Sequence, residues 1–202
     1  MKKIILTLSV LVLVTSCGSF KAKRVDAKES DDKALTITDN WMSADTTMAI
    51  QDVLRQIKAH QGFQKYLAQN GGTPKLFIAD VQNTTSEAYF PIQDLNDELL
   101  NELSASGEFI LIDNQARESI LKEVTYQNDG MVDPKTAKSI GKQTGADLMI
   151  FGNVYMKPEK RDGKTIKQYS VNLRMTDIEK AVEVMRARTK VDKYSEKKAV
   201  GW

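Results

Sequence analysis

The sequence has one cysteine, Cys17, and one histidine, His60, among its 202 residues. A single thiol excludes a disulfide within the chain and a redox pair of cysteines. The same scarcity excludes a zinc site built from histidine and cysteine ligands. A Ser-His-Asp triad would require His60, and no G-x-S-x-G motif is present to supply its nucleophile. The inventory therefore predicts that the protein is not an enzyme and holds no metal or cofactor, with His60 in a structural or solvated position.

Neither sign of charge is in large excess, with 29 Lys+Arg against 27 Asp+Glu. Lys2 and Lys3 lie in an N-terminal segment that we expect to be removed, which leaves 27 residues of each sign. Nucleic-acid-binding proteins normally carry a basic excess that neutralises phosphates. The charge balance therefore argues against nucleic acid as a partner.

Only one long apolar run occurs, Ile4–Val14. It is too short for a permanent membrane-spanning helix, and its basic start is typical of a secretory signal. It ends in Val14-Thr15-Ser16-Cys17, which resembles a bacterial lipobox, where the cysteine is acylated and becomes the new N-terminus. The sequence thus predicts a signal peptide over residues 1–16 and a lipid anchor at Cys17. An ordinary signal peptide is the alternative.

Residues 18–37 are mostly charged or small and have no sustained apolar periodicity. Such a composition does not bury enough apolar surface to order itself. We expect residues 17–37 to form the lipid anchor and a flexible tether, with a reach of at most about 70 Å. Residues 38–202 then form one domain, and Trp41 marks its start as an aromatic side chain packed back onto the core.

Apolar periodicity within the domain predicts an α/β fold. Leu95, Leu99 and Leu103 have helical spacing, and Asp162-Gly163 is a strong hairpin signal between two strands. The predicted architecture is a two-layer sandwich whose mixed sheet ends in an antiparallel three-strand meander. Predicted helices begin near Ser43 or Asp45, before Phe63, at Pro91, at Asn114 and at Asp133, and predicted strands are Lys75–Val81, Glu108–Asp113, Asp147–Lys160, Lys164–Asp177 and Val182–Lys193.

Four acids, Asp94, Asp97, Glu98 and Glu102, cluster on the helix after Pro91. Such a group could hold a cation or catalyse glycoside hydrolysis. We favour a solvated face, because acids early in a helix favour its dipole and these positions lie opposite the leucines.

The predicted meander brings three arginines together. Arg174 lies on the polar face of its strand, where Tyr169, Val171, Leu173 and Met175 alternate with Gln168, Ser170, Asn172 and Arg174. Arg186 and Arg188 alternate similarly in the next strand, so antiparallel pairing should make a basic strip. The strip is a candidate partner-binding surface, and an uncommitted solvated face is the alternative.

Short motifs occur in order along the chain and carry a resemblance. They are W-x-x-x-D at Trp41–Asp45, N-x-T-S-E at Asn83–Glu87, D-E-L-L at Asp97–Leu100, A-R-E-S-I-L-K-E from Ala116 to a Tyr126-Gln127 end, the segment Ala137–Gly152, and L-R-M-T-D-I-E at Leu173–Glu179. Together they resemble the penicillin-binding protein activator LpoB family of outer-membrane lipoproteins, over about residues 40–192. The sequence departs from the family's pattern in two places. Its tether is short and lacks a proline-rich stretch, and its last turn reads Glu179-Lys180-Ala181, where the family more often has a glycine.

The resemblance implies a non-catalytic protein of TolB N-terminal-like fold, anchored at the outer membrane and facing the periplasm. It implies a class A penicillin-binding protein, a bifunctional peptidoglycan synthase, as the partner that is activated by direct contact, with no small-molecule substrate. The loop Asn83–Phe90, held between a strand and a helix, is the first candidate contact, because the resemblance at Asn83, Thr85, Ser86 and Glu87 falls outside obvious core positions. The basic strip is the second candidate. The alternative is that Asn83 and Ser86 satisfy backbone groups of the turn.

Two other functions remain open from the sequence. A curli-type secretion or other envelope-assembly lipoprotein would share related folds. A secretion pore, however, needs long amphipathic hairpins, and the hairpin at Asp162-Gly163 is charged at its tip and short. An enzyme acting on the cell wall is disfavoured by the residue inventory.

Overall fold

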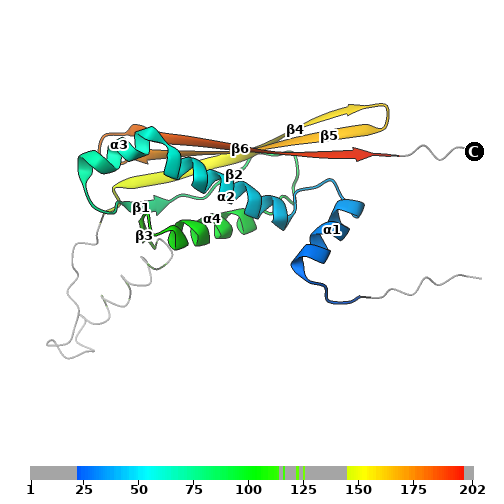
Figure 1. Ribbon diagram of the computed structural model, residues 1–202, viewed down its shortest axis with the longest axis horizontal. Helices are drawn as coiled ribbons and strands as arrows, with labels where there is room; N and C mark the ends of the chain where they lie inside the picture. The colour runs from blue at the N-terminus through cyan, green and yellow to red at the C-terminus, as the bar shows by residue number, and fades with distance from the viewer. Residues whose placement is uncertain (1–21, 114–115, 117–121, 123–124, 126–144, 198–202) are drawn as a thin grey trace, which may run out of the picture.

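The computed structural model describes residues 22–113, 116, 122, 125 and 145–197. One mixed sheet has the strand order β3-β1-β4-β5-β6, with β2 paired to β4. Helices α2, α3 and α4 lie along one side of it (Figure 1). The helices are α1 (Ala27–Ile37), α2 (Ser43–Ala59), α3 (Gln61–Asn70) and α4 (Ile92–Ser106), and the strands are β1 (Lys75–Ile78), β2 (Gln82–Asn83), β3 (Ile110–Ile112), β4 (Leu148–Arg161), β5 (Lys164–Asp177) and β6 (Val182–Glu196).

The sheet combines parallel and antiparallel pairing. β1 runs parallel to β3 and β4, and β2 runs parallel to β4. β4, β5 and β6 form an antiparallel meander. The predicted α/β fold, with a mixed sheet ending in a three-strand meander, is therefore confirmed. The likeness to the TolB N-terminal type stays a prediction.

The core lies between the helices and the adjacent face of the sheet. On α4, the predicted stripe of Leu95, Leu99 and Leu103 is fully buried, and Gly107 (φ 68°) ends the helix in the left-handed conformation. On β5, the predicted inward set is fully buried: Tyr169, Val171, Leu173 and Met175. The spacing of apolar residues thus predicted both the elements and the face that each one buries.

Trp41 packs at the start of α2, as the sequence predicts. Its ring lies 5.3 Å from the ring of Phe90 and 5.2 Å from that of Tyr169, and its indole N–H donates to Thr46 Oγ1 at 2.8 Å. The predicted cap differs, because Met42 is the N-cap residue and α2 begins at Ser43. Asp45 instead accepts a hydrogen bond from the Met42 amide at 2.9 Å, from the third position of the helix.

His60 joins α2 to α3, between the two helical segments that the sequence predicts. Its Nδ1 atom accepts a hydrogen bond from the Gly62 amide at 3.1 Å, at the start of α3. The histidine side chain therefore caps a helix, which agrees with the structural role expected for it.

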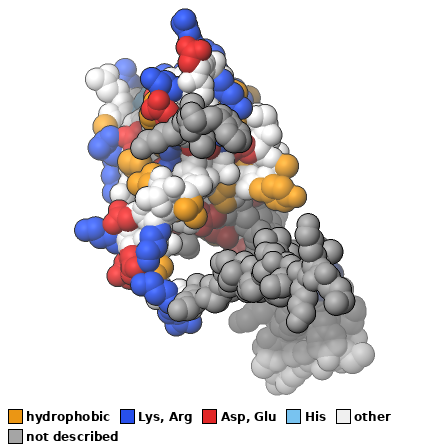
Figure 2. All heavy atoms as spheres, turned by 90° about the vertical axis from the view of Figure 1, so that its right-hand side faces the viewer, with side chains coloured by type: hydrophobic (Ala, Val, Ile, Leu, Met, Phe, Trp, Pro, Cys, Tyr) orange, Lys and Arg blue, Asp and Glu red, His pale blue; other side chains and the backbone are white. Residues whose placement is uncertain are grey.

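The two turns of the meander both need left-handed residues. Asp162 (φ 48°) and Gly163 (φ 76°) close the predicted two-residue hairpin between β4 and β5. Figure 2 views the molecule from the end that carries this hairpin, where basic and acidic side chains are interspersed. Ala181 (φ 55°) lies in the turn between β5 and β6, where the LpoB pattern more often has a glycine. A left-handed alanine costs roughly 1–2 kcal/mol, which explains why glycine suits this turn.

Three expectations differ from the structure or lie outside it. Residues Ala27–Ile37 form helix α1, where the sequence predicts no order; Asp26 caps it by accepting from the Glu29 amide at 2.8 Å. Because α1 has no buried residue, local capping rather than core packing stabilises the helix, and composition does not predict such a cap.

The strands also differ from the prediction, because β1 ends at Ile78 and β2 was not predicted. The helices expected from Asn114 and from Asp133 lie largely outside the described residues.

Among the residues that the structure describes, no helix has both the length and the apolar character needed to cross a bilayer.

Candidate partner-binding surface

The meander brings the three predicted arginines together on the face of the sheet opposite the helical core. Arg174 pairs in register with Arg186, and Asn172 pairs with Arg188. We call Arg174, Arg186 and Arg188 the basic strip. Antiparallel pairing therefore places these side chains as the alternation along β5 and β6 predicts.

Each arginine of the basic strip is held by a neighbour. Arg186 makes two bonds to Glu183, at 3.0 Å and 2.8 Å, and Arg188 Nε donates to Asn172 Oδ1 at 2.6 Å. The Arg174 guanidinium lies 4.5 Å from the centre of the Phe151 ring, within the range of a cation–π contact. The hydrogen bond from Arg186 is the main cause that lowers the pKa of Glu183. These contacts orient the guanidinium groups and leave Arg186 and Arg188 exposed.

A shallow depression of about 400 Å³ follows the basic strip and is also lined by Phe151, Asn153 and Tyr155. A hydrogen bond with Ser170, and then the charge of Arg188, lower the pKa of the Tyr155 hydroxyl. Guanidinium groups beside aromatic rings bind carboxylates through paired donors and planar groups by stacking. This surface therefore suits an acidic partner.

The loop Asn83–Phe90 is the first predicted contact, and several of its hydrogen bonds lie within the turn. Asn83 Oδ1 accepts from the amide and the hydroxyl of Thr85, at 2.9 Å and 2.7 Å. The Glu87 amide donates to Thr85 Oγ1 at 3.1 Å. Asn83 and Thr85 therefore satisfy the turn, as the alternative interpretation of Asn83 predicts, whereas Ser86 is exposed. Their role in partner binding stays a prediction.

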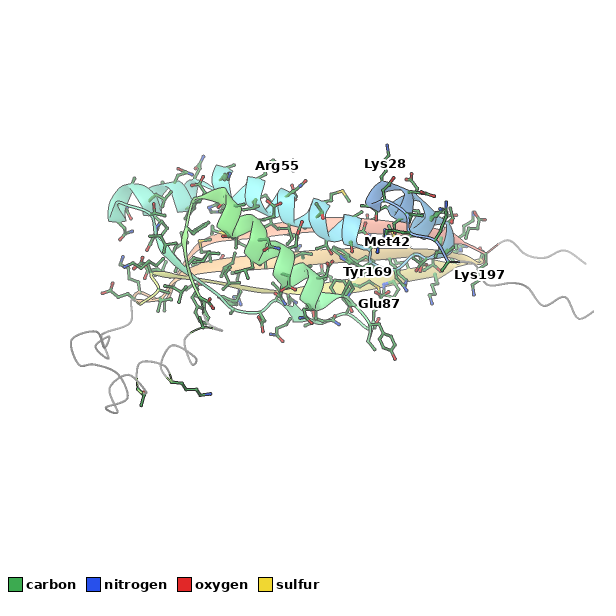
Figure 3. The ribbon with its side chains drawn as sticks, turned by 90° about the horizontal axis from the view of Figure 1, so that it is seen from below. Lys28, Met42, Arg55, Glu87, Tyr169 and Lys197 are labelled. Atoms are coloured by element: carbon green, nitrogen blue, oxygen red, sulfur yellow. The ribbon has the colours of Figure 1, made fainter. Side chains whose placement is uncertain are left out.

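The Glu87 carboxylate points back into the domain. It accepts from the Tyr169 hydroxyl at 2.8 Å and pairs with Lys167 at 2.8 Å, and Lys167 pairs in turn with Asp39 at 2.9 Å. Figure 3 shows Glu87 close to Tyr169, near Met42 at the start of α2. Burial, reinforced by the bond to Glu87, raises the pKa of the Tyr169 hydroxyl. Glu87 therefore links the loop to the sheet and is not free for a partner in this conformation.

We expect Glu87→Arg to lower the melting temperature by about 5 °C. The change removes an acceptor from the buried Tyr169 hydroxyl, which costs about 1–3 kcal/mol, and places a cation beside Lys167. Thermal unfolding followed by circular dichroism measures the shift. Ser86→Arg, which adds the same side chain at an exposed neighbour, should melt as the wild type does. Equal melts for all three proteins would contradict a stabilising role for Glu87.

The acidic cluster on α4 has the arrangement of a solvated face. Asp94 and Asp97 are exposed, whereas Leu95, Leu99 and Leu103 of the same helix are buried. Among the described residues, no group of three or more His, Cys, Asp or Glu side chains is placed to hold a metal ion.

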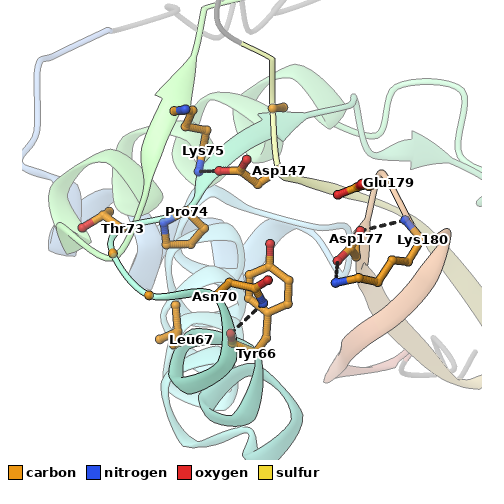
Figure 4. Close-up of a pocket in the computed structure, with 13 residues that line it drawn as sticks. Tyr66, Leu67, Asn70, Thr73, Pro74, Lys75, Asp147, Asp177, Glu179 and Lys180 are labelled. Atoms are coloured by element: carbon orange, nitrogen blue, oxygen red, sulfur yellow. Dashed lines mark hydrogen bonds and ion pairs between the residues drawn. The ribbon is translucent and has the colours of Figure 1, made fainter.

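A pocket of about 410 Å³ lies between the end of α3, the start of β1 and the β5–β6 turn (Figure 4). Two of its acids bond to backbone amides. Asp147 accepts from the Lys75 amide at 2.8 Å and joins the starts of β4 and β1, and Asp177 accepts from the Lys180 amide at 2.9 Å in the β5–β6 turn. Burial, and then the charge of Asp177, raise the pKa of the Tyr66 hydroxyl. These two acids therefore stabilise the fold around the pocket.

Sequence reasoning did not single out Tyr89, which lies near the end of the loop Asn83–Phe90. Its side chain is 99% exposed, whereas Phe90 beside it is 6% exposed. Periodicity does not distinguish the two aromatic residues, because neither lies in a helix or a strand. The only signal in the sequence is an aromatic pair within an otherwise polar loop.

The protein is an α/β domain whose mixed sheet and adjoining loop carry the two candidate contact surfaces. The model of the peptidoglycan-synthase activator LpoB family matches residues 45–191. Since this match spans most of the chain, the protein belongs to the LpoB family, whose members activate peptidoglycan synthases and are not themselves catalysts. A search of curated proteins found no match.

The comparison with solved structures found matches at low sequence identity. The C-terminal domain of LpoB from Salmonella enterica is 15% identical, with a TM-score of 0.41, and the match covers 73% of this chain and 98% of that one. The NMR structure of Escherichia coli LpoB is 14% identical, with a TM-score of 0.39, and the match covers 96% of this chain and 90% of that one. Lipoprotein GNA1162 from Neisseria meningitidis is 12% identical, with a TM-score of 0.39 and coverage of 63% and 88%.

Proposed function

We propose that this LpoB-family protein is an outer-membrane lipoprotein that activates a class A penicillin-binding protein from the periplasmic side. Family membership supports activation of a peptidoglycan synthase. The lipobox-like end of the apolar N-terminal run supports acylation at Cys17. The observation that carries the contact mechanism is the basic strip, because its arginines are exposed and already oriented.

Activation by a protein of this kind follows from differential binding. A domain without its own chemistry alters a synthase only by binding one conformation of it better than another. Oriented guanidinium groups suit an acidic surface on the synthase, and complementary charge raises the rate of encounter. The basic strip then acts as the docking site, and the stimulated reaction is carried out by the partner.

The segment 17–37 holds the domain near its membrane in this proposal. An anchored domain meets its partner at a high effective concentration only if the linker spans the gap. The segment lacks a proline-rich stretch, and residues Ala27–Ile37 are helical, which shortens its reach because a helix rises about 1.5 Å per residue. The proposal therefore requires a synthase that extends toward the outer membrane or a narrow periplasm.

We expect residues 38–202, added to the class A synthase of the same organism, to raise glycan polymerisation while having no activity alone. Reversing Arg186 and Arg188 together to glutamate should weaken this stimulation about tenfold or more. The melting temperature should stay unchanged, because exposed ion pairs contribute little to stability. Polymerisation of labelled lipid II and a thermal melt measure the two effects.

The control reverses two cations at the hairpin tip, Lys160→Glu with Lys164→Glu, and should stimulate as the wild type does. If the wild-type domain neither binds nor stimulates the synthase, the proposed function is wrong. If the tip variant loses as much stimulation as the strip variant, the contact depends on total charge and not on the basic strip.

A further inference from the structure

Tyr89 is held on a fixed loop and is nevertheless 99% exposed. Exposure of an aromatic ring to water is unfavourable, and tyrosine is enriched where proteins bind each other. Because a tyrosine side chain has only two χ angles, it loses little conformational entropy when an interface immobilises it. The exposed ring of Tyr89 therefore suits a partner-binding role better than a role in folding the loop.

The chain is fastened on both sides of Tyr89. Glu87 reaches Tyr169 and Lys167 with its carboxylate. Phe90 is buried against the rings of Trp41 and Tyr169, at 5.3 Å and 6.3 Å. The Phe90 amide also donates to the Glu87 carbonyl at 3.2 Å. Because residues 87 and 90 are anchored, the backbone presents Tyr89 with little conformational freedom left to lose on binding.

The loop is also joined to the face that carries the basic strip. Where β2 ends, the amide and hydroxyl of Thr84 both donate to the Val154 carbonyl, at 2.8 Å and 2.7 Å. On the strip side, Asn153 Nδ2 donates to Thr84 Oγ1 at 3.0 Å. The loop therefore wraps the edge of β4, with Thr84 bonded on the strip side and Glu87 bonded on the helix side.

One row of residues crosses the sheet from this loop to the basic strip. Asn153 pairs in register with Asn172, and Asn172 pairs with Arg188. Adjacent strands lie about 4.8 Å apart, so the row from Thr84 to Arg188 spans roughly 15 Å. Tyr89 lies five residues beyond Thr84, which adds at most about 18 Å of chain. Tyr89 and the basic strip are therefore at most about 33 Å apart, comparable to the width of a standard interface, which takes about 800 Å² from each partner.

We propose that Tyr89 is the aromatic anchor of the same interface as the basic strip, and that both contact one partner. The inference rests on the proposed function and specifies its partner surface, which presents an apolar pocket for the tyrosine ring beside an acidic patch for the arginines. Charge then guides the encounter, and burial of the ring holds the complex. The two predicted contacts are thus parts of one surface.

The test compares binding of the class A synthase of the same organism to full chains purified in detergent, by biolayer interferometry. Tyr89→Ala should raise the dissociation constant about 10- to 100-fold, mainly through faster dissociation. The melting temperature should not change, because the removed side chain touches water. Tyr194→Ala is the matched control: Tyr194 is exposed on β6 but lies six residues from Arg188, roughly 20 Å along the strand.

The outcomes separate this inference from the proposed function. Wild-type binding that is weakened by the Arg186 and Arg188 reversal, but not by Tyr89→Ala, overturns the anchor and leaves the proposed function standing. Loss of binding in Tyr194→Ala equal to that in Tyr89→Ala overturns the location of the interface. Failure of the wild-type chain to bind overturns both proposals. Weakening by Tyr89→Ala and by the arginine reversal, with the control unchanged, supports one shared surface.

Discussion

Replacing Lys193 with methionine is expected to lower the melting temperature by about 10 °C, the largest loss of stability among the changes considered. Lys193 Nζ lies 2.6 Å from Asp45 Oδ2, and the two side chains are 8% and 7% exposed. The same Asp45 oxygen accepts from the Met42 amide at 2.9 Å at the start of α2. The substitution leaves a carboxylate buried without its cation, which costs about 3–5 kcal/mol.

Circular dichroism melts of the same protein measure this loss, and two variants control it. Lys190→Met makes the same change on the exposed face of the same strand and should melt as the wild type does. Lys193→Met combined with Asp45→Leu should recover part of the loss, because a buried ion pair can be replaced by apolar side chains at small cost. A wild-type melt for Lys193→Met alone would show that the pair does not stabilise the domain.

Replacing Cys17 with alanine is expected to remove the lipid and move the protein from the membrane pellet to the soluble fraction of the periplasm. Each buried methylene of an acyl chain contributes about 0.8 kcal/mol, and several chains together anchor a protein stably. Fractionation with immunoblotting and incorporation of labelled palmitate measure the two consequences. Ser19→Ala, two residues away, should keep both the label and the membrane association.

This prediction has a clear contrary result. Palmitate incorporation that persists in Cys17→Ala would show that the anchor is elsewhere, and an unlabelled wild-type chain would show that there is none. The melting temperature of the folded domain should be the same in both proteins, because the change lies outside residues 38–202.

Much of the fold could be predicted from local patterns. Leu95, Leu99 and Leu103 lie on one stripe of a helix because the helical repeat is 3.6 residues, and they are buried. The basic strip could be predicted for the same reason, because alternation along β5 and β6 assigns each side chain to a face. The register then paired Arg174 with Arg186. These features depend on residues that are close in the sequence or in adjacent strands.

The contacts of the loop Asn83–Phe90 could not be predicted from local sequence patterns. Glu87 was expected to be free for a partner, but its carboxylate accepts from Tyr169, which is 82 residues away in the chain. Helix α1 was missed for the opposite reason: its capping by Asp26 is local, but its composition has no apolar stripe. In both cases a specific polar contact, rather than apolar periodicity, decided the conformation.

Local sequence patterns predicted most of the helices and strands and the faces that they bury, because backbone periodicity is a property of the chain. They did not predict α1 or β2. Three features became visible only in the folded protein. The Glu87 carboxylate is bonded to Lys167, and Tyr89 is exposed beside a buried Phe90. Thr84 and Asn153 join the loop to the face that carries the basic strip. The physical reason is that these states depend on distances between β2, β4 and β5, which arise only when strands far apart in the sequence pair.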